Sequence, residues 1–198
     1  MTDREMPIDA AAAFPRPSDV IFPGAPGTKV SARSSTGQAW YDYTTGYKEA
    51  ADLLVSHVET TGRRADKLGY PIVFLYRQHL ELVVKSLIRV CCHVLAREQD
   101  FPKHHRLDEL WQMCARLLHE ISPGASEEEV EQTTRLFHEF RTVDPNADAF
   151  RFPEDTSGNA SLATGIDINL SEVRDIVEKI SFFLDCLDTS ITAERDAF

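Results

Sequence analysis

The feature that most constrains the fold is a long apolar segment from Ile72 to about Arg97. Its apolar residues cover more than one face of a helix: Leu75, Leu80, Val83, Val84, Leu87, Ile88, Val90, Cys91 and Leu95. A helix that is apolar on several faces must be covered by neighbouring elements. The segment therefore predicts a central, buried helix, with Pro71 in its first turn.

Four further segments carry apolar residues at helical spacing, at about residues 40–61, 105–121, 127–143 and 171–187. Gly62 is expected to end the first segment, and Ser126 with Glu129 to begin the third through a capping box. Asn169 or Ser171 should cap the last one. Because no segment alternates as a strand does, we predict an all-α bundle of about five helices. A long irregular segment over residues 144–168 separates the last two.

The composition predicts two regions and a cytoplasmic location. Residues 1–38 are rich in Pro, Gly and Ser and predict a flexible tail before a helical domain at 39–198. The N-terminus has no apolar stretch typical of a secretory signal, and no apolar run approaches the ~20 residues that cross a membrane. Of the four cysteines two are adjacent, which suits reduced thiols. The net charge of −11 argues against a broad duplex-DNA surface but leaves room for a local basic pocket.

A polar stripe interrupts the central apolar helix. Arg77, Glu81, Lys85 and Arg89 recur every four residues, a spacing that brings neighbouring side chains within ion-pairing reach. Two interpretations stay open: a solvated face of ion pairs, or a polar seam that faces a cleft or a partner.

A second candidate is the cationic run of residues 103–106, which contains His104 and His105. Arg97 precedes His104 by seven positions. An imidazole can act as general base or acid, and a guanidinium can stabilise a phosphorane. Together they would support RNA cleavage by the neighbouring 2′-hydroxyl without a metal. The alternative is a polar connector in which one histidine caps a helix.

Metal binding finds little support. Cys91, Cys92 and His93 are consecutive, so on a helix they point about 100° apart and cannot share one ion. No second Cys/His pair has zinc spacing, and the sequence lacks a phosphate-binding glycine loop, a nucleophile elbow and an HExxH motif. We therefore expect neither a metal nor a cofactor.

The third candidate is Arg151, which stands between Phe150 and Phe152 and before Pro153 in the long loop. In one interpretation the two aromatic rings anchor the loop in the core and Arg151 pairs with an aspartate. In the other, Arg151 is held inward to bind an anion.

Three stretches together resemble HEPN-like proteins of prokaryotes in their order and spacing. They are Tyr76-Arg77-Gln78-His79-Leu80-Glu81-Leu82 running on to Lys85, His105-Arg106-Leu107-Asp108-Glu109-Leu110-Trp111, and Phe150-Arg151-Phe152-Pro153. The resemblance covers roughly residues 40–190. It implies an up-and-down helical bundle that often dimerises. Many members are metal-independent RNases of toxin–antitoxin, abortive-infection or other phage-defence systems, while others bind RNA, nucleotides or partner proteins.

Catalytic members carry an arginine, four to six other residues and then a histidine, and Arg97 and His104 fit with six between them. One hypothesis is therefore an endoribonuclease in which His104 is general base or acid and Arg97 stabilises the phosphorane. Backbone phosphates would be positioned by Arg77, Lys85 or Arg151.

The other hypothesis is a non-catalytic module. In it the polar seam, with Glu81 and His105 included, binds a partner protein, RNA or a small anionic ligand. The expected partners are RNA, a second copy of the chain, and a cognate antitoxin or defence-system protein, with no membrane. A neighbouring enzyme such as a nucleotidyltransferase is a further possible partner.

Overall fold

The computed structural model describes residues 39–98, 100–124, 126–162 and 165–196, together with positions 15, 17, 19, 20 and 32. The chain divides into two units, residues 1–36 and 37–198, and the fold below is that of the second unit. The predicted flexible tail, residues 1–38, falls almost wholly outside the described residues.

Five helices make up the second unit: α1 (Ala39–Thr61), α2 (Ala65–Val94), α3 (Leu107–Ile121), α4 (Glu127–Val143) and α5 (Leu170–Asp196). The described residues contain no β-strand, only an isolated antiparallel bridge between Glu154 and Ala160 in the loop after α4. The predicted all-α class with five helices is confirmed. No helix within the described ranges is both long enough and apolar enough to cross a membrane.

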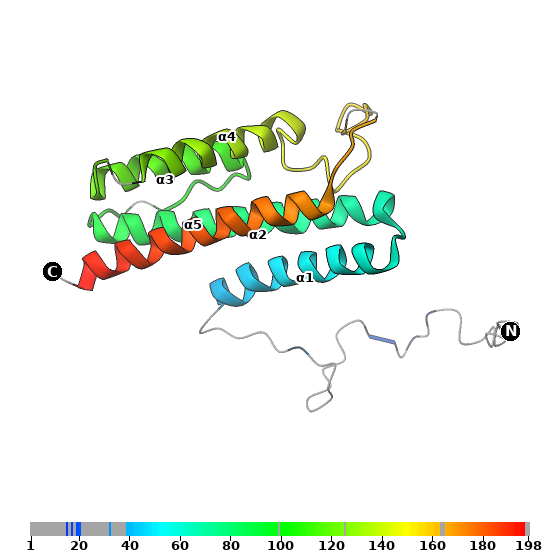
Figure 1. The fold of residues 1–198 in the computed structure, drawn as a ribbon, viewed down its shortest axis with the longest axis horizontal. Helices are drawn as coiled ribbons and strands as arrows, with labels where there is room; N and C mark the ends of the chain where they lie inside the picture. Colours follow the sequence, from blue (N-terminus) through cyan, green and yellow to red (C-terminus); the bar gives the residue numbers. More distant parts are fainter. Residues whose placement is uncertain are drawn as a thin grey trace, which may run out of the picture. The chain divides into compact units, whose positions relative to one another are not determined.

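The central position predicted for α2 is confirmed. This helix packs against α1, α3 and α5, while α4 packs on α3. Figure 1 shows α1 on one side of α2 and the α3–α4 pair on the other. Buried residues extend over most of the length of α2, and Ile72, Tyr76, Leu80, Val84 and Ile88 have no exposed surface. Burial of apolar area on this scale is the main stabilising contribution to such a bundle.

The connection between α2 and α3 folds back along α2. Residue contacts trace this path: Phe101 lies over Lys85 and His105 bonds Glu81, so the chain passes the middle of α2 again before α3 begins. At the far end of α3, Glu120 pairs with Arg97 just beyond α2. Helices α2 and α3 therefore run in the same direction, whereas α1–α2 and α3–α4 are antiparallel (Figure 1).

The helix ends only partly follow the sequence signals. Gly62, with φ of 62°, directly follows α1 as expected, and Asn169 caps α5 by accepting the Glu172 N–H at 3.2 Å. The prediction for Pro71 is wrong, because α2 already begins at Ala65 and Pro71 lies inside it. The predicted capping box is also wrong. Ser126 adopts a left-handed conformation, and its side chain makes no capping bond.

Candidate functional site

Three of the four residues of the polar stripe of α2 are buried, and the fourth, Arg89, is exposed. Arg77, Glu81 and Lys85 are 3%, 1% and 6% exposed. Glu81 Oε1 accepts Lys85 Nζ at 2.7 Å and His105 Nδ1 at 2.8 Å, and its Oε2 lies 3.3 Å from Arg77 Nη1. For Arg77, Glu81 and Lys85 the interpretation as a solvated face is therefore wrong. These three residues face the chain's own connector between α2 and α3.

The network keeps Glu81 ionised despite its burial. Burial raises the pKa of this carboxyl, but the hydrogen bonds from Lys85 and His105 outweigh it, so the pKa of Glu81 is lowered. A carboxylate only accepts hydrogen bonds, so the Nδ1 atom of His105 carries a proton. His105 thus belongs to the buried network, although its side chain is 64% exposed.

The far side of Arg77 fixes the loop after α4. Its Nη2 donates to the carbonyl of His105 at 2.5 Å, and its Nε lies 3.3 Å from Asp144 Oδ2, a pair without good hydrogen-bond alignment. Asp144 Oδ1 accepts the N–H groups of Asp148 and Ala149 at 2.8 and 3.0 Å. Ion pairs and hydrogen bonds within the chain therefore occupy Arg77, Glu81 and Lys85, and the arrangement holds three segments together.

A second buried polar group, His79, was not singled out by sequence reasoning as a functional residue. Its Nδ1 donates to the carbonyl of Thr44 at 2.9 Å, and its Nε2 lies 2.8 Å from Ser181 Oγ. Burial lowers the pKa of His79 and outweighs the bond to Thr44. This neutral ring joins α1, α2 and α5. The sequence could have indicated this role, because His79 lies on the apolar face of α2, where a buried polar side chain needs hydrogen-bond partners.

The two residues predicted to be catalytic both pair with acids of α3. Arg97 Nη2 lies 2.5 Å from Glu120 Oε2, with both side chains about half exposed. His104 Nε2 lies 3.5 Å from Glu109 Oε2, and its Nδ1 accepts the N–H of Arg106 at 3.3 Å. The structure gives no direct contact between Arg97 and His104 within the described residues.

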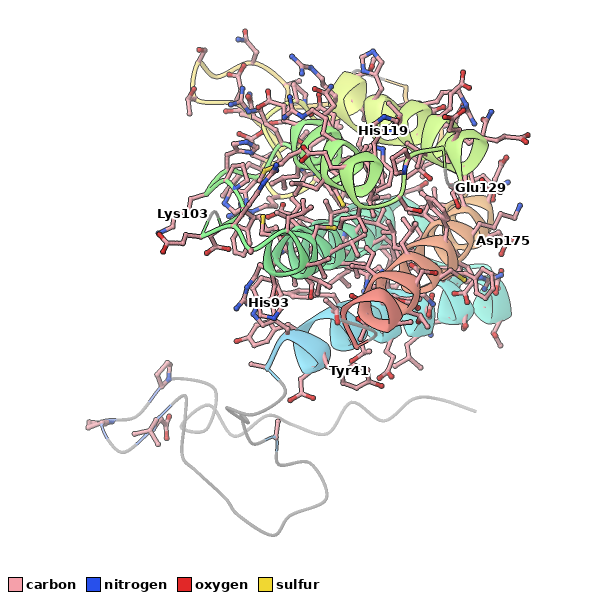
Figure 2. The ribbon with its side chains drawn as sticks, turned by 90° about the vertical axis from the view of Figure 1, so that its left-hand side faces the viewer. Tyr41, His93, Lys103, His119, Glu129 and Asp175 are labelled. Carbon is pink, nitrogen blue, oxygen red and sulfur yellow. The ribbon has the colours of Figure 1, made fainter. Side chains whose placement is uncertain are left out.

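Arg97 instead borders a polar pocket at the end of α2, with a volume of about 550 Å³. Its lining residues are Ser86, Arg89, Val90, Cys92, His93, Arg97, Glu98 and Asp100. Figure 2 views the bundle from this end and places His93 at its edge. The guanidinium of Arg89 lies over the Trp40 ring at 5.3 Å, and no ion pair to Arg89 or His93 occurs in the described part of the chain.

The turn after α2 brings Arg97 back to this pocket. The N–H of Arg97 bonds the carbonyl of Cys92 at 2.8 Å, and that of Ala96 bonds the carbonyl of His93 at 3.1 Å. This is the Schellman pattern of helix ends. The left-handed position is taken by Ala96, with φ of 51°. The sequence signal for His93 was the four-residue period, which continues from Arg89 through His93 to Arg97.

Arg151 occupies a different region, and the predicted arrangement of two core-anchored rings with an aspartate partner is not found. Phe150 is buried at 7% exposure and Phe152 is 52% exposed, so only one ring anchors the loop. The Arg151 guanidinium lies over the rings of Phe74 and Phe152, at 5.8 and 5.1 Å. No carboxylate partner of Arg151 occurs among the described residues, and the side chain is exposed.

A further pocket between α4 and α5 is apolar, with a volume of about 360 Å³. Its charged lining residues are Glu139, Asp167 and Glu172, all acidic, which makes it unsuited to a phosphate. The described residues contain no group of three His, Cys, Asp or Glu side chains placed to hold a metal. Cys91, Cys92 and Cys114 are buried without a disulfide, and burial raises the pKa of the Cys114 thiol.

Comparison with protein-family models, with curated proteins and with solved structures finds no match to this chain.

Proposed function

We propose that this protein is a HEPN-like endoribonuclease that cleaves RNA without a metal at the pocket lined by Arg89, His93 and Arg97. The observation that carries the proposal is the meeting of one imidazole and two guanidiniums at one polar pocket. The resemblance of the sequence to HEPN-like proteins supports the same chemistry and includes Arg97.

The chemistry needs only side chains of this kind. His93 takes the proton of a ribose 2′-hydroxyl, whose oxygen attacks the adjacent phosphorus. The guanidiniums of Arg89 and Arg97 stabilise the charge of the phosphorane. The 5′-oxygen leaves and takes a proton from water, and the protonated His93 then releases its proton to the solvent. The products are a 2′,3′-cyclic phosphate and a 5′-hydroxyl. His104, the histidine that fits the HEPN spacing, is the alternative base.

On the strength of the resemblance we extend the proposal to the protein's setting. It is a cytoplasmic homodimer and a toxin or phage-defence nuclease, held inactive by a cognate antitoxin or other partner. The three buried, unbridged thiols are consistent with a reducing compartment. Size-exclusion chromatography with light scattering tests the dimer, and relief of toxicity on expression by Arg97→Ala tests the biological role.

A second candidate function is non-catalytic binding of RNA, of a partner protein or of a small anionic ligand. The pairing of Arg97 with Glu120 and of His104 with Glu109 favours it over catalysis, because carboxylates of α3 already engage both side chains that the HEPN spacing assigns to catalysis. Glu98 and Asp100 also line the pocket and offset its positive charge.

The deciding experiment is cleavage of single-stranded RNA by the purified full chain in excess EDTA. The wild type is compared with Arg97→Ala, His93→Ala and His104→Ala. His119→Ala is the matched control, since it removes an exposed histidine of α3 that does not line the pocket. A substrate with 2′-deoxy nucleotides tests the role of the 2′-hydroxyl.

We expect loss of about 100-fold or more of the activity in His93→Ala and in Arg97→Ala, with His119→Ala unchanged and the deoxy substrate uncut. Loss in His104→Ala with His93→Ala active would move the base to His104. If the folded wild type does not cleave RNA but retains it in a filter-binding assay, the nuclease proposal is refuted and the non-catalytic binding function is supported.

A further inference from the structure

Arg151 is an exposed arginine of this acidic domain whose charge no described carboxylate neutralises. Arg77, Arg97 and Arg141 each pair with a carboxylate. Arg151 instead lies over two aromatic rings and has no acidic partner in the described ranges. Ring stacking occupies the faces of a guanidinium and leaves its N–H groups in the plane free. An anion can therefore bind edge-on while the stacking persists.

The loop that carries Arg151 is held in place. Asp144 accepts two backbone N–H groups from the turn before it, and the Arg151 N–H itself bonds the carbonyl of Asp148 at 2.9 Å. The buried Phe150 anchors the loop to the core. The guanidinium is thus presented on a fixed backbone, so binding would require little ordering of the main chain.

A pocket of about 650 Å³ opens beside this group, within the range of sites for small organic ligands. Among the described residues, Arg151 is the one charged lining residue; the others are apolar or aromatic apart from the Tyr70 hydroxyl. Tyr70, Phe152 and Ile166 are 51%, 52% and 40% exposed, so large apolar surface remains open to a ligand. Tyr70 of this pocket precedes His93 by 23 residues on α2, which corresponds to ~35 Å along the helix. The pocket is therefore separate from the one lined by His93.

We propose that this pocket binds a planar aromatic carboxylate. The carboxylate forms paired hydrogen bonds with the edge of Arg151, as guanidiniums do with carboxylates. The aromatic ring packs among Tyr70 and Phe152, where offset and edge-on ring contacts add to the buried apolar area. The inference concerns a second site and does not depend on the proposed nuclease.

The side chains of the pocket favour an aromatic carboxylate over a nucleotide or a fatty acid. A nucleotide would bring a ribose and a phosphate of nearly two charges, which need several donors and acceptors. The described part of the lining offers one cation and one phenol. An alkyl chain would fill the space but would forgo the ring contacts with Tyr70 and Phe152.

The test is titration of the full chain with 2-naphthoate, followed by calorimetry. 2-Naphthamide has the same ring without the charge. Arg151→Gln removes the cation, and Arg151→Lys keeps it without the planar fork. Arg116→Gln is the matched control, since Arg116 is also exposed and unpaired among the described residues and does not line the pocket. Because Arg151 is exposed, circular dichroism should show that these variants fold like the wild type.

We expect saturable binding of 2-naphthoate, weakened at least tenfold in Arg151→Gln and by an intermediate factor in Arg151→Lys, but unchanged in Arg116→Gln. Naphthamide should bind at least tenfold more weakly than naphthoate. Equal affinity of acid and amide, an unaffected Arg151→Gln, or no saturation with naphthoate would each overturn the proposal. Tighter binding of AMP or of decanoate than of naphthoate would replace the aromatic carboxylate by a nucleotide or a fatty acid.

Discussion

Replacing Glu81 by glutamine should strongly destabilise the domain. The substitution keeps the shape of the side chain but removes the negative charge that Lys85 and Arg77 share. Both cations would remain buried; Arg77 would keep its pair with Asp144, whereas Lys85 has no other ion pair among the described residues. The surroundings cannot hydrate them, because Lys85 and Arg77 are 6% and 3% exposed.

The expected cost follows from the burial of this network. Removal of one partner from a buried ion pair costs about 3–5 kcal/mol, and the glutamine oxygen retains one acceptor, so we expect a loss of about 3 kcal/mol. In a domain of this size that loss corresponds to a fall in Tm of about 6–12 °C. The apolar pair Glu81→Leu with Lys85→Met should cost much less, since both buried charges leave together.

The assay is urea unfolding followed by circular dichroism, with Glu139→Gln as the matched control. Glu139 pairs with Arg135 at 2.6 Å with the same four-residue spacing, but both side chains are at least 60% exposed. The control should therefore lose at most about 0.5 kcal/mol.

The pH dependence gives a second readout. Because the pKa of Glu81 is lowered from its ordinary 4.5, the contribution of its charge is fully present above pH 4.5 and is lost as the pH falls through the lowered pKa. The difference between wild type and Glu81→Gln should close in that acid range. Equal stabilities of Glu81→Gln and Glu139→Gln at neutral pH would refute the reasoning.

Two further predictions concern His79 and Ala96. The pKa of His79 is lowered from 6.5, so the unfolded chain binds a proton below pH 6.5 that the folded chain excludes. The unfolding free energy should therefore fall between pH 6.5 and 5 by up to about 1.4 kcal/mol per pH unit, and equilibrium unfolding should show a flatter profile in His79→Gln. Ala96→Gly should stabilise the domain by about 1 kcal/mol, because glycine adopts φ of 51° without strain; thermal unfolding measures it, and a lower Tm would contradict the argument.

Local sequence patterns were sufficient to predict the five helices and the central place of α2. The apolar residues of α2 recur on several faces. A helix of this kind is buried when other helices surround it, so it takes the central position. Helix ends were less predictable because they depend on backbone conformation as well as residue type. Ser126 could cap α4 from its side chain, yet its backbone is left-handed. Pro71 suits a first turn, yet the helix begins six residues earlier.

The candidate site was less predictable because it joins distant segments. The four-residue stripe was visible in the sequence, but the sequence could not show that the connector before His105 folds back to cover it. Nor could spacing alone show that His93 and Arg97 border one pocket while His104 faces Glu109. Side-chain pairs across such separations depend on the path of the loop between the helices.

The sequence by itself determined the all-α class and the buried helix at its centre, because periodicity and apolar content act over a few turns of one helix. Only the tertiary structure decided which charges are satisfied within the chain and which remain available. Glu81 is enclosed by Lys85 and His105, whereas Arg151 is left without an acid among the described residues. A charged side chain carries the same charge in either place. Its partners come from segments that the folded chain alone brings together.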